Sequence, residues 1–170
     1  MESRLAGFSN GARPGGGEAT GPDPTNRGKA GTKRHLLVDR EGAPLAATLS
    51  GTDIHDSQML EATLDAVEPI KRPRGRPRQR PNKLHANKAY DPARCRQACR
   101  RRGVTLRIAQ RGIESSERLG RHRPVVERTL ARLNRFRRLR VRYERLAEIH
   151  EAFLQLGCAL IVWNYVQRFC

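Results

Sequence analysis

Gly120–Arg145, GRHRPVVERTLARLNRFRRLRVRYER, is the stretch that most constrains the fold of this chain. Val126, Leu130 and Leu133 recur at intervals of four and three residues, which is the spacing of one apolar face of an α-helix. Glu127 is a lone carboxylate near the start of this helix. Arginines cover the remaining helix surface, at positions 128, 132, 135, 138 and 142. The stretch predicts an arginine-rich helix that packs one face against a core.

The position of Glu127 has two interpretations. Arg123 precedes it by four residues, so both side chains lie on one helix face and can form an exposed ion pair. Such pairs are common, and each stabilises a helix by only about 0.3–0.5 kcal/mol. Spacing alone favours this structural role over a functional one.

Charge is the strongest signal in the composition. The 170 residues are enough for one modest domain, and Lys+Arg number 34 against 17 Asp+Glu, which gives a net charge of +17. A balance of this kind favours a polyanionic partner, and nucleic acid fits it best. We find no lysine-rich amphipathic helix of the kind that binds a membrane surface.

The apolar and cysteine content points to an ordinary buried core. The most apolar stretch, Phe153–Val166, is interrupted by Gln155 and Asn164, so we expect a core helix and no membrane span. Trp163 and Phe153 are expected to be buried in it. The N-terminus has no continuous apolar region, so no secretory signal peptide is expected. The four cysteines do not have zinc-site spacing or form a disulfide framework; their positions are Cys95, Cys99, Cys158 and Cys170.

Strand and helix patterns alternate along the chain, which predicts an α/β fold. Residues 1–28 are rich in glycine and proline and are expected to be irregular, with the domain occupying 29–170. The predicted strands are Lys33–Asp39, Ala43–Leu49, Lys83–Tyr90 and Val104–Gln110. The predicted helices, besides the arginine-rich one, run from Asp56 to Val67 and from Asp91 to Arg102, each with its aspartate as N-cap, and from Ala147 to Arg168. A polar loop is expected over 111–119.

A basic loop occupies residues 71–82 and begins KRPRGRPRQRP. Proline and charge leave it no core positions. Its centre, PRGRP, resembles an AT-hook, in which an extended Arg-Gly-Arg lies in the minor groove of A·T-rich DNA. We expect Arg74 and Arg76 to contact the DNA backbone.

Several segments together resemble insertion-sequence transposases with an RNase H-like DDE domain. RHRPVVERTLARLNRFRRLRVRYER followed by EIHEAF is similar to the C-terminal segment of that family, and KLHANKAYD, GTDIHDSQML and TGPDPTNRGKAGTKRHLLVDREGAPLA extend the similarity back to about Thr20. The family pattern R-x-x-x-E matches Arg123 and Glu127. The chain departs from the family at Pro124, where a bulky aromatic is usual, and at Asn134, near which a basic residue is common.

The resemblance implies phosphoryl transfer on DNA by two divalent cations, Mg²⁺ or Mn²⁺, held about 3.5–4 Å apart by three carboxylates. Glu127 matches the third carboxylate and would be a metal ligand. Asn87 stands where the D-x-x-Y-D pattern has its first aspartate, and Asp91 is the second aspartate of that pattern. The carboxylate of the first strand is absent, because Asp23 lies between two prolines, which do not fit a core strand.

The resemblance therefore implies an RNase H-like mixed sheet flanked by helices, which we expect to lack its first strand and to leave one sheet edge open. It also implies a cytoplasmic, nucleoid-associated protein that binds double-stranded DNA, as a monomer or a homo-oligomer, and that has lost strand cleavage. The expected DNA contacts are Arg74, Arg76, Arg123, Arg128, Arg132 and Arg135. The alternatives are a non-catalytic basic DNA-binding protein and an RNA-binding protein, the latter disfavoured by an aromatic content of 5%.

Overall fold

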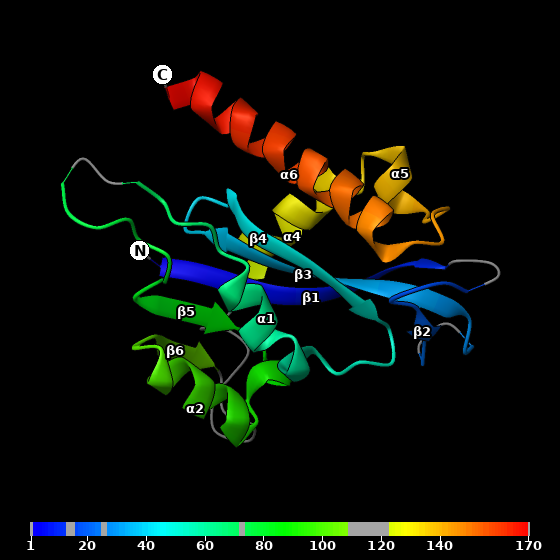
Figure 1. The fold of residues 1–170 in the computed structure, drawn as a ribbon, viewed down its shortest axis with the longest axis horizontal. Coiled ribbons are helices and arrows are strands. Elements are labelled where there is room, and N and C mark those ends of the chain that lie inside the picture. Colours follow the sequence, from blue (N-terminus) through cyan, green and yellow to red (C-terminus); the bar gives the residue numbers. More distant parts are fainter. Residues whose placement is uncertain (1, 13–15, 25–26, 72–73, 109–122, 170) are drawn as a thin grey trace.

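Strand β1, Glu2–Ala12, runs through the middle of the sheet (Figure 1). It pairs antiparallel with β3, Ala30–Asp39, and parallel with β5, Lys83–Ala86. The computed structural model describes residues 2–12, 16–24, 27–71, 74–108 and 123–169. The expectation that residues 1–28 are irregular and that the first strand is missing is therefore wrong for residues 2–12. Gly7, Asn10 and Gly11 weaken the strand pattern in the sequence, and pairing with neighbours on both sides overrides that weak local preference.

The described strands form one six-stranded mixed sheet, as expected for the RNase H-like class. β4, Pro44–Gly51, pairs antiparallel with β3, and β2, Gly21–Pro22, pairs with the start of β3. β6, Thr105–Ile108, pairs parallel with β5. These pairings confirm the predicted β3–β4 hairpin and the predicted sheet neighbours Lys83–Tyr90 and Val104–Gln110. β5 is shorter than predicted and β6 begins one residue later than predicted. Residues 109–110 of that prediction, and the loop predicted over 111–119, lie outside the described residues.

The turn between β3 and β4 is built by one carboxylate. Asp39 Oδ1 accepts hydrogen bonds from the backbone N–H groups of Glu41, Gly42 and Ala43 at 2.8–2.9 Å. Gly42 has a φ of 100°, which favours glycine over residues with a side chain. This turn lies against α4, where Thr129 Oγ1 donates to the Gly42 carbonyl at 2.7 Å.

Helices cover both faces of the sheet (Figure 1). On one face, α1 (Leu60–Asp65) and α2 (Ala93–Arg101) pack over a core that includes Leu5, Leu37 and Leu84. On the other face, α4 (Arg123–Leu133), α5 (Arg137–Arg140) and α6 (Ala147–Phe169) pack over Leu36, Val38 and Ala47. Two short 3₁₀ helices, η1 (Asp56–Gln58) and η2 (Lys88–Tyr90), lead into α1 and α2.

The arginine-rich helix is shorter than predicted. α4 ends at Leu133, and Phe136 has an extended backbone before α5 begins. Asn134 lies in this break, where its Oδ1 accepts a hydrogen bond from the Arg34 guanidinium at 2.7 Å. Because the helix stops there, Arg135, Arg138 and Arg142 are not on it.

The two predicted aspartate caps are also wrong. The side chain of His55 caps η1 by accepting from Ser57 N–H, and Asp56 forms an ion pair with Lys33 at 2.9 Å. Asp91 forms an ion pair with Arg96, within the first turns of α2. In both cases a cation within reach competes with the backbone N–H groups for the carboxylate.

Arg142 is buried with a relative exposure of 1% and joins three separate segments. Its guanidinium donates to Thr32 Oγ1 on β3 at 2.7 Å and to the backbone oxygens of Glu144 and Arg145 at 3.0 and 3.3 Å. It also lies 3.5 Å from the Ala19 carbonyl. Arg142 thus fixes the chain that enters α6 against the sheet.

His35 makes the stability of the fold depend on pH. The ring is fully buried on β3, with Nε2 2.8 Å from Ser50 Oγ. Burial lowers the pKa of His35 to about 4; the Asp56 carboxylate raises this pKa and the Lys33 ammonium lowers it further, both by smaller amounts. Since the folded pKa lies below the unfolded value of 6.5, the unfolded chain takes up a proton first as pH falls. The free energy of unfolding is therefore highest above about pH 6.5 and falls as the pH is lowered toward about 4. At pH 5 the loss due to His35 is roughly 2 kcal/mol.

Urea unfolding at pH 7.5 and pH 5 checks this expectation. The matched variant is His35→Gln, because glutamine can still bond to Ser50 but does not titrate. Its loss of stability between the two pH values should be smaller by roughly 2 kcal/mol. Equal losses in the two proteins would rule out His35 as the source.

Candidate functional site

Asn87 follows the last residue of β5 and is exposed. Its Oδ1 accepts a hydrogen bond from the backbone N–H of Ala89 at 3.0 Å and so caps η2. The amide carries no charge, and its oxygen is already used in the cap. Asn87 is therefore a poor ligand for a hard dication, which needs anionic oxygen.

The register of the sheet identifies the position of β1 that lies beside Asn87. Leu5 pairs with Ala86 in the parallel ladder, so the next position along, Ala6, lies beside Asn87. Leu5 and Ala86 both belong to the core under α1 and α2. Because side chains alternate along a strand, Ala6 and Asn87 point to the opposite face, and Ala6 indeed packs against the core under α4.

Glu127 lies on α4, in the layer that covers this same face. Its neighbours Val126 and Leu130 are buried, whereas the Glu127 side chain is exposed. The structure thus places Glu127 on the helix that covers the face toward which Ala6 and Asn87 point. Within the described ranges, no group of three His, Cys, Asp or Glu side chains comes together to hold a metal ion.

Gly7, the next residue of β1, faces the other side of the sheet. A Cβ atom built on Gly7 would lie 2.7 Å from the Asp56 carboxylate, which is closer than real contacts allow. The carboxylate at the start of the strand, Glu2, pairs in the ladder with Lys83, four residues before Asn87. It bonds to Lys83 Nζ at 2.8 Å and lies 4.0 Å from His85 Nε2. Neither residue supplies an acidic ligand beside Asn87.

The arginines of α4 and of the turn after it differ in exposure. Arg128 on α4 and Arg135 in the turn are exposed and are available to a polyanion. Arg132 is half-buried: its guanidinium donates to the Tyr165 hydroxyl at 2.9 Å and lies 5.4 Å from the centre of that ring. Arg123 is the first residue of α4. Arg132 therefore has a packing role on α6, which spacing alone does not reveal.

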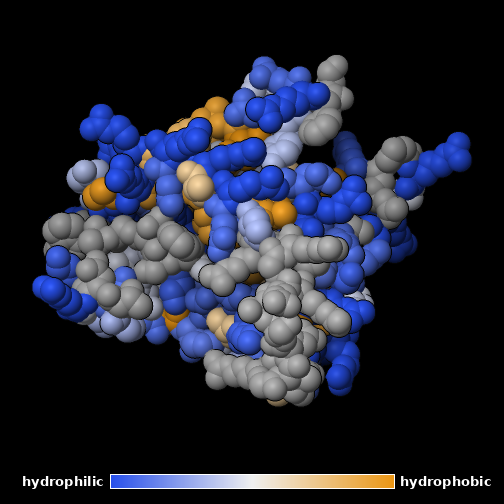
Figure 2. All heavy atoms as spheres, turned by 180° about the vertical axis from the view of Figure 1, so that it is seen from behind, coloured by the Kyte–Doolittle hydropathy of each residue, from blue (hydrophilic) through white to orange (hydrophobic). Residues whose placement is uncertain are grey.

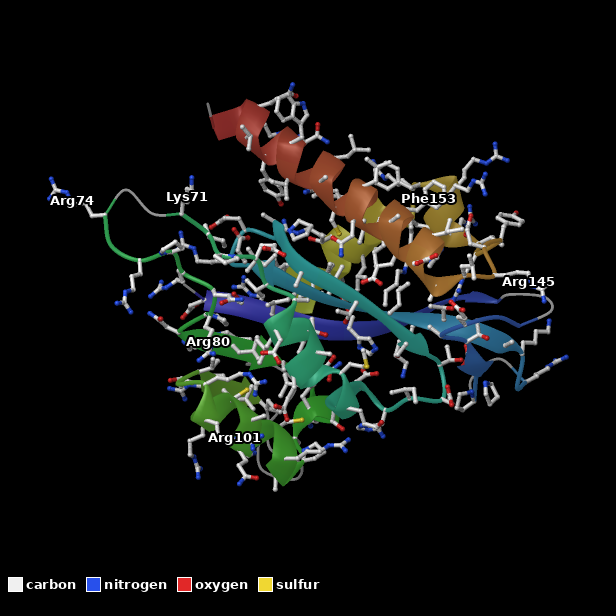
Figure 3. The ribbon with its side chains drawn as sticks, viewed as in Figure 1. Lys71, Arg74, Arg80, Arg101, Arg145 and Phe153 are labelled. Atoms are coloured by element: carbon white, nitrogen blue, oxygen red, sulfur yellow. The ribbon has the colours of Figure 1, made fainter. Side chains whose placement is uncertain are left out.

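The basic loop projects away from the sheet (Figure 3). Ile70 and Arg78 close its neck with two backbone hydrogen bonds of 2.8 Å. Beyond this neck Arg74 and Arg76 are exposed, and Gly75 between them has a φ of 89°. The loop thus presents two exposed arginines beyond its neck, and their predicted contact with nucleic acid stays a prediction.

The sequence did not predict that Arg34 is buried or that Trp163 is exposed. Arg34, with a relative exposure of 2%, is buried, and burial lowers its pKa to about 10. Trp163, predicted to be buried, is 58% exposed on α6. The signal for Trp163 was present in the sequence, because α6 has apolar residues on more than one face, but only the packing shows which face is covered.

Two hollows of the described structure lie away from Asn87 and Glu127. One, of about 350 Å³, lies between β4 and α6 and is lined by residues such as Ala46 and Trp163. Another, of about 420 Å³, lies between η1 and α2. Glu127 and Asn87 line neither. No helix of the described ranges is long and apolar enough to span a membrane.

Comparison with known proteins gives consistent results. The family described as Transposase DDE domain matches residues 8–163. The chain is 50% identical over 149 residues to the "Putative transposase for insertion sequence element IS402" of Burkholderia cepacia, which covers 88% of this chain and 71% of that protein. Among solved structures it is similar to the catalytic core domain of BIV integrase, with a TM-score of 0.48, 12% identity, and coverage of 92% of this chain and 80% of that one. The chain belongs to the DDE transposase family of insertion sequences.

Proposed function

We propose that this protein binds double-stranded DNA as a transposase of an insertion sequence but does not itself cleave or transfer DNA strands. The observation that carries the proposal is the arrangement where β1 passes the end of β5. Ala6 and Asn87 directly follow Leu5 and Ala86, the last pair of the parallel ladder, and neither offers a carboxylate. Glu127 alone would leave two dications short of anionic ligands.

The residues present do not fit a pair of Mg²⁺ or Mn²⁺ ions, so we propose no metal-dependent step for this chain. An alanine methyl has no donor atom, and the Asn87 amide oxygen is held in a backbone cap. Metal affinity at Glu127 would be that of a single exposed carboxylate. Binding of DNA should consequently be the same with Mg²⁺ and with a chelator.

The proposed DNA contacts are exposed arginines on the basic loop and on α4. Their charge, within a net charge of +17, supports electrostatic binding with little sequence preference. A partner of this kind would place the protein on the nucleoid in the cytoplasm. On the face drawn in Figure 2, hydrophilic side chains dominate the coloured surface and hydrophobic ones gather in its upper part.

Replacing Arg74 and Arg76 by alanine should make DNA binding less dependent on salt. In a plot of log affinity against log salt, each lost phosphate contact reduces the slope by about 0.9, so the double variant should lose about two. Fluorescence anisotropy with a duplex over a range of NaCl concentrations measures this slope.

The matched control is the pair Arg100→Ala and Arg107→Ala, which removes the same charge from exposed positions on α2 and β6. That pair should change the slope by clearly less than one contact. Absence of binding at low salt, or equal slopes for both double variants, would contradict the assignment of the loop. A requirement for Mg²⁺ in binding would contradict the absence of a metal site.

A further inference from the structure

The segment between α5 and α6 exposes a tyrosine ring. Val141 has an extended backbone, with φ −127° and ψ 127°, and the side chains that follow alternate between the surface and the interior. Val141, Tyr143 and Arg145 are exposed, whereas Arg142 is buried. Tyr143 has a relative exposure of 67%, the highest among the large hydrophobic side chains of the described ranges. One exposed ring is ordinary on a protein surface, and its meaning depends on what holds and surrounds it.

Hydrogen bonds on both sides fix the backbone at Tyr143. The preceding residue, Arg142, is anchored to β3 through the Thr32 hydroxyl at 2.7 Å. The Tyr143 N–H donates to one oxygen of the Glu144 carboxylate at 3.2 Å, and Arg138 donates to the other at 2.9 Å. Only 6% of the Glu144 side chain is exposed. The ring therefore stands on a fixed backbone, so that little conformational entropy is lost when a ligand binds to it.

The surface around Tyr143 is strongly basic. Residues 137–146 contain five arginines and a single carboxylate, Glu144, which is mostly buried and bonded to Arg138. Four of these arginines are exposed, at positions 137, 138, 140 and 145. The next exposed carboxylate along the chain is Glu148, in the first turn of α6. The ring is thus flanked in the chain by cations, which attract a polyanion.

We propose that this surface binds single-stranded DNA, with an unpaired base stacked on Tyr143 and phosphates held by the exposed arginines of 137–145. Proteins that bind single strands combine these two elements, since every base has a flat face that stacks on an aromatic ring. The bases inside a duplex stack on one another and present only their edges in the grooves. A protruding tyrosine is consequently of use to a single strand and not to a duplex.

The proposed surface is separate from the duplex contacts assigned to the basic loop. In Figure 3, Arg145 lies at the opposite end of the molecule from Arg74, so the proposal depends on neither the loop nor the metal ligands. A second copy of the chain is a poor occupant of this surface, because it would bring the same arginines against one another. Since the chain belongs to a transposase family, the single strand that we propose is DNA, and RNA is tested as the alternative.

Anisotropy of a fluorescent oligothymidylate of about 15 nucleotides measures this binding. Tyr143→Ala should weaken it roughly tenfold, and Tyr143→Leu as much, because leucine keeps an apolar side chain but has no ring to stack on a base. Tyr143→Trp should retain the affinity of the unmodified chain. All three variants should bind a duplex of the same length with unchanged affinity.

Two further changes accompany these variants. Trp163→Ala removes another exposed aromatic ring, at 58% exposure, from a helix with a single arginine, and should leave binding of the oligothymidylate unchanged. Replacing Arg140 and Arg145 by glutamine should reduce the slope of log affinity against log salt by about 0.7 for each lost phosphate contact. Circular dichroism spectra and urea midpoints check that each variant folds.

Failure of the unmodified chain to bind the oligothymidylate overturns the proposal. So does a Tyr143→Leu variant with full affinity, or an equal loss of single-stranded and duplex binding in Tyr143→Ala. Tighter binding of an oligouridylate of the same length overturns the assignment to DNA. A dimer, measured by light scattering, that Tyr143→Ala converts to the 19.2 kDa monomer assigns the ring to a second copy and overturns the proposal as well.

Discussion

Replacing Arg142 by methionine is expected to lower the free energy of unfolding by roughly 3 kcal/mol, because one buried and several partly buried polar groups lose their donor at once. The buried Thr32 hydroxyl and the partly buried backbone oxygens of Glu144 and Arg145 would each lose one hydrogen bond. Methionine keeps much of the arginine side-chain volume, so the loss reports hydrogen bonding more than packing. Urea unfolding followed by circular dichroism measures the difference.

Arg140→Met is the matched control for this prediction. It removes the same charge two residues earlier, from an exposed side chain at the end of α5. Surface substitutions of this kind usually change stability by no more than about 0.5 kcal/mol. Equal effects at positions 140 and 142 would show that Arg142 acts only through charge and not as a structural link.

Residues whose environment is local were predictable from the sequence. The period of Val126, Leu130 and Leu133 located α4, and two strand-like segments on either side of a turn at Gly42 located the β3–β4 hairpin. Both depend on contacts that recur within a few residues.

Features that depend on distant partners were not predictable. β1 has glycine within it and is a strand because β3 and β5 pair with it on both sides. Asp56 has the sequence of a helix cap, yet Lys33, more than twenty residues earlier, takes its carboxylate. In the same way, no local pattern separates Arg142, which is buried, from Arg135, which is exposed.

The candidate site shows the same division. Asn87 and Glu127 could be chosen from the sequence because their surroundings resemble family motifs. The position opposite Asn87 could not, since it requires the register of two strands about 80 residues apart in the chain, here Leu5 with Ala86. From that register we infer that Ala6 stands at the position where the family has its first-strand carboxylate.

Restoring the two carboxylates together is expected to convert an inactive chain into a metal-dependent nuclease. Asn87→Asp alone should stay at background, because Ala6 still provides no ligand. Ala6→Asp combined with Asn87→Asp places two carboxylates side by side on the face under α4, where Glu127 can complete the set. In that double variant Glu127→Gln should return cleavage to background and leave DNA affinity nearly unchanged, since it removes a metal ligand and no phosphate contact.

The structure also provides a control that differs by one position. Gly7→Asp combined with Asn87→Asp adds the same two carboxylates, but the new side chain at position 7 points to the opposite face, against Asp56. This variant should not cleave DNA. Because a side chain at position 7 meets Asp56, the circular dichroism spectrum and urea midpoint of this variant are measured as well. Failure of a variant that folds normally, beside an active Ala6→Asp variant, would show that the face of the sheet, and not the added negative charge, determines activity.

The most direct test of the central claim is a plasmid nicking assay with Mg²⁺ and with Mn²⁺, run on the unmodified chain and on the Ala6→Asp, Asn87→Asp double variant. We predict no nicking above a metal-free blank for the unmodified chain, and nicking by the double variant that requires both metal and Glu127. Metal-dependent nicking by the unmodified chain, unaffected by Glu127→Gln, would contradict the assignment of Ala6, Asn87 and Glu127 to one degraded catalytic site.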